Sequence, residues 1–173
     1  MSFSANEIAS LAQKAARGAG FPPRQAEVFG AATVHHLAGG GAPTALLHAL
    51  ADPTDSPILR LPLLAEDILR ALTLSGPEIT LTLQPGDEAL ALAYTALMHI
   101  HIERAAVDQP EGAPPRLVLC ADLDTSSRAR LPARIDAPAD LIEHLSGLAA
   151  KTHVAATGES RDAGAGAGNI DND

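Results

Sequence analysis

The chain has 173 residues, of which 46% are hydrophobic, and this is enough for one domain with a genuine core. Its formal net charge of −9 opposes binding to nucleic-acid phosphates and to anionic membrane surfaces. Three phenylalanines, one tyrosine and no tryptophan leave few side chains on which bases could stack. We therefore expect no nucleic-acid partner and no membrane partner.

Cysteine content and hydropathy indicate the compartment. One cysteine, Cys120, excludes an internal disulfide framework and a Cys-rich zinc site, and its apolar surroundings predict a small core residue. The first residues contain no basic stretch followed by an apolar segment, as a secretory signal would. The longest apolar stretch, residues 89–102, is too short to span a bilayer. A cytoplasmic protein is the expectation.

The opening residues predict a capped helix. Ser4 and Glu7 stand three positions apart, which is the spacing of a capping box. Apolar residues then recur every three or four positions as far as Ala19. Gly18 or Gly20 is expected to end this helix in a left-handed cap.

Three further helices are expected before residue 74. Pro22-Pro23 begins the second, and the three glycines at 39–41 end it. A short third helix ends at Asp52-Pro53, and a fourth runs from about Pro62 to Thr73. Because the connections are short, these elements predict a compact helical N-terminal half.

The hydrophobic period changes after residue 78. Apolar and polar residues alternate from Ile79 to Gln84, which predicts a half-buried strand, and Leu117–Ala121 predicts a second strand. The length of the apolar segment Glu88–Ala106 favours a buried helix between them. Strand, helix and strand together predict a βαβ unit with parallel strands, to which Ala133–Ile135 can add a third.

A final helix is expected from Pro138 to about Lys151, followed by a tail. Residues 159–173 contain a glycine–alanine repeat and one large apolar residue, Ile170. Two interpretations stay open: a disordered terminus, or extended backbone laid along a protein surface. The sequence thus predicts an α+β domain over 1–158, with a helical N-terminal half packed on a small, partly parallel sheet, and a tail over 159–173.

Basic residues near the two ends suggest an anion clamp. Lys14 and Arg17 lie off the apolar face of the first helix, and Arg161 is the strong hydrogen-bonding cation of the tail. Glu159 could pair with Lys14 or Arg17 if the two ends meet. Such a clamp would hold a carboxylate or phosphate, with Glu159 or Asp122 as proton acceptor.

The best metal candidate is His99, His101 and Glu103. On a strand these positions project from one face, so two imidazoles and a carboxylate could hold one ion with an open position. The alternative is an amphipathic stretch with its isoleucines inward. On a helix the two histidines would diverge and the metal hypothesis would fail.

Other polar groups have ordinary interpretations. His36 falls on the inner face of the second helix and is expected to be an interior histidine with a satisfied ring, whereas His35 is expected to be exposed. Asp122 and Asp124 follow a predicted strand, where they could bind a cation or a polar substrate. A turn is favoured for this pair, because Asp, Ser and Thr bond their own backbone.

Both ends of the chain resemble an uncharacterised bacterial family filed as a domain of unknown function. The resemblance rests on Asn6–Gly20, with its Lys-Ala-Ala-Arg-Gly-Ala-Gly segment, on residues 26–40, and on Glu159-Ser160-Arg161 followed by Gly164–Gly168. His153 and Ala155 stand where that family more often has tyrosine and proline. The resemblance implies a shared fold and a shared surface at the two ends, and it implies no activity.

Two functions are expected from the sequence. The first is a non-catalytic accessory or binding module, because no convincing nucleophile and base occur together and the tail suits docking to a protein partner or to a second copy. The alternative is an enzyme, or an enzyme subunit, acting on a small anionic metabolite. The sequence leaves the cofactor unknown.

Overall fold

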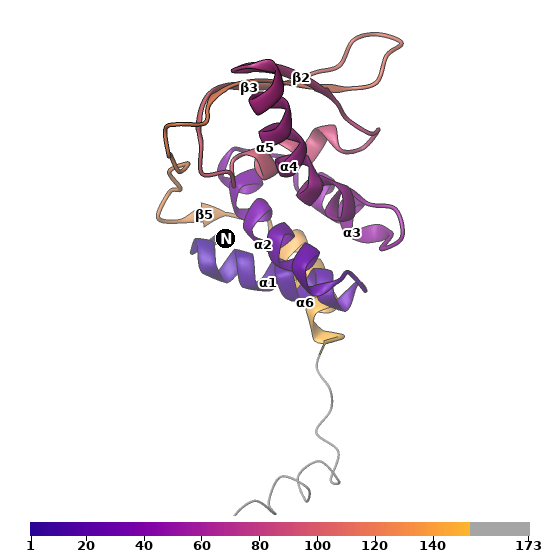
Figure 1. Cartoon of the computed structure of the whole chain (residues 1–173). Helices are drawn as coiled ribbons and strands as arrows, with labels where there is room; N and C mark the ends of the chain where they lie inside the picture. Colours follow the sequence, from indigo (N-terminus) through magenta and orange to yellow (C-terminus); the bar gives the residue numbers. More distant parts are fainter. Residues whose placement is uncertain (153–173) are drawn as a thin grey trace, which may run out of the picture.

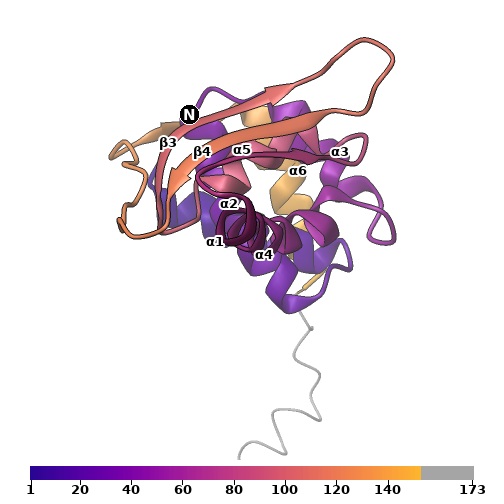
Figure 2. The same cartoon turned by 45° about the horizontal axis from the view of Figure 1, so that its top comes forward.

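A computed structural model describes residues 1–152 of the chain. Helices and strands are mixed, which confirms the α+β class. The helices are α1 (Ala5–Gly18), α2 (Pro23–Ala38), α3 (Pro43–Ala51), α4 (Pro57–Ser75), α5 (Glu88–Thr95) and α6 (Ala139–Ala150). The strands are β1 (Ser2–Phe3), β2 (Glu78–Thr82), β3 (His101–Asp108), β4 (Arg116–Asp122) and β5 (Ile135–Asp136). The larger sheet lies over one end of the helices (Figures 1 and 2).

The larger sheet is antiparallel, in the order β2–β4–β3. Glu78 of β2 and Arg104 of β3 both pair with Cys120, from opposite sides of β4. The prediction of a partly parallel sheet was therefore wrong. β2 and β3 do run in the same direction with α5 between them, but the chain returns through the loop 109–115 and places β4 between the two strands. β2, α5 and β3 therefore form a split βαβ unit, in which β4 lies between the two parallel strands, and not the predicted βαβ unit with adjacent parallel strands.

The predicted long helix over Glu88–Ala106 was also wrong. α5 ends at Thr95, a short turn follows, and His101 begins β3. The second half of this segment forms a strand because β4 supplies backbone hydrogen-bond partners along residues 101–108. Tertiary pairing here outweighs a local composition that suits either structure.

Cys120 is not in the core, contrary to expectation. β4 alternates between a buried face with Leu117, Leu119 and Ala121 and an outer face with Val118 and Cys120. The thiol is partly exposed there. Burial alternates along the strand with the period of two that a sheet buried on one face requires. The sequence did not show this alternation, because the residues on both faces from Leu117 to Ala121 are apolar.

The N-terminal residues form a second, two-stranded sheet with β5. Ile135 of β5 pairs with Phe3 of β1, so the strand expected near 133–135 joins the N-terminus and not the larger sheet. The Met1 amino group donates to the Ala137 carbonyl oxygen at 3.0 Å, and the Ala137 N–H donates to Met1 O at 2.8 Å. This small sheet holds the starts of α1 and α6 together.

Close helix packing forms the rest of the framework. A Cβ atom on Gly18 would stand 1.8 Å from the Leu148 carbonyl oxygen, so α1 and α6 touch through backbone at this point. Gly20, with φ of +103°, turns the chain toward α2, as the predicted left-handed position requires. Within residues 1–152, every helix is too short or too polar to cross a membrane.

α4 begins five residues before the predicted start at Pro62. The buried Ser56 hydroxyl accepts from the Ile58 N–H at 3.1 Å and donates to the Ala49 carbonyl oxygen at 2.5 Å. This cap starts the helix at Pro57, where proline is favoured, and Pro62 lies inside the helix. The early start adds Leu61 to the α4 residues that line the hollow described next.

Candidate functional site

An open hollow of about 750 Å³ lies between α2, α4 and the segment that follows α5. Apolar side chains from all three elements line it: Val28 and Ala31 from α2, Ala65 and Leu69 from α4, and Leu97 and Met98 beyond α5. The small side chains Ala31 and Ala65 leave room between the two helices. We call this hollow the α2–α4 groove.

Exposed leucines and charges surround the α2–α4 groove. Leu63 is 59% exposed and Leu69 is 41% exposed, although both are large apolar side chains. Arg24 and Glu27 form an exposed ion pair at 2.9 Å on the α2 side. Glu66 on the α4 side belongs to none of the ion pairs found among residues 1–152. The rim therefore presents unbalanced negative charge beside apolar surface.

Tyr94 lies against the groove and is 4% exposed. Its hydroxyl has no hydrogen-bond partner among the described residues. Burial is the main cause that raises the pKa of this hydroxyl well above its usual range, and the negative charge of Asp87 raises it further. The hydroxyl therefore stays protonated at any physiological pH.

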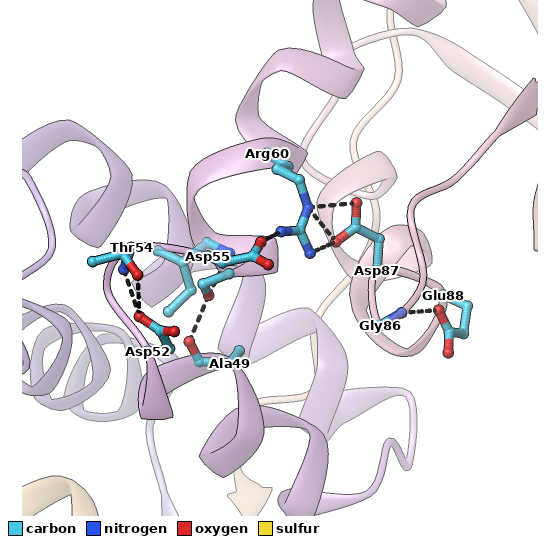
Figure 3. Close-up of polar contacts among 10 residues, drawn as sticks. Ala49, Asp52, Thr54, Asp55, Arg60, Gly86, Asp87 and Glu88 are labelled. Atoms are coloured by element: carbon cyan, nitrogen blue, oxygen red, sulfur yellow. Dashed lines mark hydrogen bonds and ion pairs between the residues drawn. The ribbon is translucent and has the colours of Figure 1, made fainter.

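A part-buried ion pair joins α4 to Asp87, the residue that precedes α5 (Figure 3). The Arg60 guanidinium donates from Nη2 to Asp87 Oδ1 at 2.7 Å and from Nε to both carboxylate oxygens at 3.1 and 3.2 Å. Arg60 also contacts the exposed carboxylate of Asp55. Because Asp87 is 5% exposed, the arginine is the main compensation for its buried charge. This pair holds the α4 wall of the groove in place.

Half of the predicted anion clamp lies within the described residues. Lys14 and Arg17 are exposed on α1 and take part in none of the ion pairs of residues 1–152. Glu159 and Arg161 lie outside the described residues. Leu148 touches Gly18, so the described chain ends within one helical turn of the point where α6 meets the basic end of α1.

The structure does not assemble His99, His101 and Glu103 into a metal site. His99 precedes β3 and lines the groove, whereas His101 pairs with Asp122 at the start of β3. An irregularity between Ile102 and Arg104 interrupts the alternation on which the prediction depended. Glu103 instead accepts a hydrogen bond from the Cys120 thiol at 3.4 Å. Across residues 1–152, no three His, Cys, Asp or Glu side chains are placed to hold an ion.

Asp122 forms the turn that was favoured for it. Its carboxylate accepts from the Thr125 hydroxyl at 2.5 Å and from the Asp124 N–H at 2.9 Å. The Thr125 hydrogen bond is the main cause that lowers the pKa of this carboxyl. A lowered pKa makes Asp122 a weaker base, which counts against the role of proton acceptor.

His35 and His36 differ less in their burial than the sequence predicted. His36 is buried, and its Nε2 lies 2.9 Å from the Ala42 carbonyl oxygen, so the predicted satisfied interior histidine is confirmed. His35 is half-buried and not exposed, and burial lowers the pKa of its ring. Neither residue lines the α2–α4 groove.

Comparison with family models, with curated proteins and with solved structures finds no match to the chain. The resemblance at the two ends therefore stays a prediction. Sequence reasoning missed the α2–α4 groove and the Arg60–Asp87 pair, which join residues far apart in the chain. One signal was present: the leucines of α4 occupy more of its circumference than a single buried stripe needs.

Proposed function

We propose that the chain is a non-catalytic binding module, and that the α2–α4 groove receives an amphipathic helix with a basic polar face. The observation that carries this proposal is the apolar lining of a hollow between two helices, with Leu63 and Leu69 exposed beside it. Helices commonly bind by laying an apolar stripe into such a groove. The volume of about 750 Å³ suits several side chains of one helical face.

Charge supports a basic partner. The whole chain carries a formal net charge of −9, and Glu66 adds to the rim a carboxylate that forms no ion pair within residues 1–152. Arg24 is already neutralised by Glu27. A helix with lysine or arginine flanking its apolar stripe would therefore be attracted by the whole molecule and by the rim, whereas an acidic helix would be repelled.

A designed peptide tests this proposal. An 18-residue helix with leucines at i, i+3, i+4 and i+7 and lysines elsewhere is titrated into the isotope-labelled chain, and a glutamate version of the same peptide serves as control. We expect amide shifts confined to α2, α4 and residues 94–100, and binding of the lysine version alone. Shifts spread over other surfaces would show only non-specific attraction to an acidic protein and would overturn the proposal.

A pair of leucines on one helix supplies the matched variants. Leu69 lines the groove, whereas Leu74, which is 79% exposed, lies outside it. Leu69→Asp should weaken peptide binding about ten-fold or more, because a carboxylate would be desolvated against apolar surface. Leu74→Asp should leave the affinity within about two-fold of the starting value. Equal loss in both variants would show that the groove is not the binding site.

The second candidate is an enzyme, or an enzyme subunit, for a small anionic metabolite. The backbone contact between Gly18 and Leu148 favours it, because this contact brings the last turn of α6 to the half of α1 that carries Lys14 and Arg17. Inorganic phosphate or citrate should then raise the melting temperature of the full chain, and Lys14→Ala with Arg17→Ala should abolish the rise. Arg24→Ala, which removes a cation elsewhere, is the control.

A further inference from the structure

β3 is an edge strand of the larger sheet, and no strand within residues 1–152 pairs with its outer side. The Ala121 N–H donates to Pro77 O and the Leu83 N–H to Pro115 O, so the odd-numbered residues of β4 bond β2. The even-numbered residues of β4 therefore bond β3, through Arg104, Ala106 and Asp108. The N–H and C=O groups of Ala105 and Val107 consequently point away from the sheet.

We propose that a second copy of this chain pairs with the free edge of β3 across a two-fold axis. An antiparallel register centred on Ala106 places Ala105 of each copy opposite Val107 of the other, and these are the residues whose backbone groups point away from the sheet. The result is a continuous six-stranded antiparallel sheet. Ala106 is exposed and small, so two copies can approach at the axis without a clash.

This register is complementary in charge. It places Arg104 of one copy opposite Asp108 of the other on the outer face, twice across the axis, and no like charges face each other within residues 104–108. Within residues 1–152 these two residues form ion pairs with exposed partners at 3.7 Å, Glu78 for Arg104 and Arg116 for Asp108. Both side chains can therefore turn toward the second copy at little cost.

This pairing would also bury apolar side chains on the inner face of β3. Ala105 and Val107 pack against the core yet remain only half-buried, because nothing among the described residues covers them from the edge side. The second copy would cover both. The irregularity between Ile102 and Arg104 limits regular pairing to residues 104–108, which is long enough for the proposed register.

The other edge of the sheet suits this role less well. α4 leads into β2 through a short connection, and the two elements lie in contact. Long-range repulsion between two copies that each carry −9 opposes any self-association. We therefore expect the dimer to strengthen as ionic strength rises, whereas a contact made mainly by exposed ion pairs would weaken.

Sedimentation of the full chain at increasing concentration tests the proposal. The wild-type chain should shift from one to two copies, and Ala105→Pro should weaken association about ten-fold or more, because proline removes an edge donor while leaving the bonds to β4. A proline at Val118 could not serve this test, because Val118 lies on the central strand β4 and the substitution would disrupt the sheet itself. A chain that stays monomeric at millimolar concentration and high salt would overturn the proposal.

Charge reversal tests the register. Arg104→Glu alone and Asp108→Lys alone each put like charges opposite each other twice, and each should weaken association about ten-fold. The double variant Arg104→Glu with Asp108→Lys restores opposite charges and should recover most of the affinity. If both single variants associate with the affinity of the wild-type chain, the dimer uses another surface and this register is contradicted.

A cross-link locates the axis. In a Cys120→Ala background, Ala106→Cys should form a disulfide between copies under mild oxidation, because paired residues at a two-fold axis bring their Cβ atoms within disulfide range. Thr80→Cys, exposed on β2, should not. Equal cross-linking of both variants would indicate random collision and would count against the proposed interface.

Discussion

Asp87 stands at the N-terminal cap of α5, yet its carboxylate makes no capping hydrogen bond and is instead held by Arg60 of α4. Aspartate at this position usually accepts from its own helix. Here the carboxylate joins α5 to α4 through two residues that are 27 positions apart in sequence. Leu61 and Ala65 of α4 and Tyr94 of α5 line the α2–α4 groove. Because the ion pair holds these two helices together, it also sets the shape of the groove.

Removing the arginine should destabilise the fold. Arg60→Ala leaves the Asp87 carboxylate buried and uncompensated, and we expect a loss of about 3 kcal/mol in the free energy of unfolding, measured by chemical denaturation. Arg70→Ala is the matched control on the same helix, because its pair with Asp67 is exposed and 3.4 Å long and should contribute less than about 1 kcal/mol. Equal effects of the two substitutions would show that the buried pair has no special role.

Two glycines test the contact between α1 and α6. Gly18→Ala would place Cβ 1.8 Å from the Leu148 carbonyl oxygen, and the neighbour is backbone, so the helices must separate. We expect a loss of more than about 2 kcal/mol in unfolding free energy. Gly147→Ala meets nothing within 4 Å and should stabilise α6 by about 0.5–1 kcal/mol. A neutral Gly18→Ala would show that the helices pack less closely than described.

Local signals in the sequence predicted the helical elements well. The Ser4–Glu7 capping box, the proline at position 23 and the final helix after Pro138 all depend on neighbouring residues, and all are confirmed. The α4 start was missed although Ser56 directly before Pro57 is itself a local N-cap signal. Pro62 competes with it, because proline is favoured at the first helical position and disfavoured inside a helix, where the structure places Pro62.

The sheet and the site required long-range information. Residues 101–108 and Glu88–Thr95 are both apolar enough for either structure, and pairing with β4 decided between helix and strand. The metal hypothesis depended on strict alternation up to Glu103, and the register shift against β4 beside Glu103 interrupts that alternation. The groove likewise depends on how α2 meets α4, which no short motif encodes.

The capping box should contribute measurably and with a defined pH dependence. Ser4→Ala removes the hydroxyl that accepts from the Glu7 N–H at 3.3 Å, and we expect a loss of about 1 kcal/mol. The Ser4 N–H donates to Glu7 at 2.7 Å and lowers the pKa of that carboxyl. This stabilisation is therefore present above the unfolded pKa and is lost as the pH falls through the folded value.

Glu7→Gln isolates this acid dependence. Its stability difference from the wild-type chain should be constant above about pH 5 and should shrink toward pH 3, as measured by denaturation at each pH. Glu27→Gln, on the exposed Arg24 pair, is the control. A difference for Glu7→Gln that does not change with pH would mean that the carboxylate charge is not what supports the cap.

The raised pKa of the Tyr94 hydroxyl predicts that the fold loses stability at alkaline pH. Burial raises the pKa of its hydroxyl, so the folded state holds this proton more tightly than the unfolded chain does. Stability is then unaffected below the unfolded pKa of about 10 and falls as the pH rises above it. Tyr94 is the single tyrosine in a chain without tryptophan, so the ultraviolet absorbance of tyrosinate follows this one group.

Ionisation of Tyr94 should therefore coincide with alkaline unfolding, followed by circular dichroism in the same samples. Tyr94→Phe removes a buried hydroxyl that has no partner among the described residues, so it should leave stability at neutral pH unchanged or raise it by up to about 1 kcal/mol. It should also shift alkaline unfolding to higher pH. Titration of Tyr94 near pH 10 in a chain that stays folded would show that its hydroxyl reaches water through the groove.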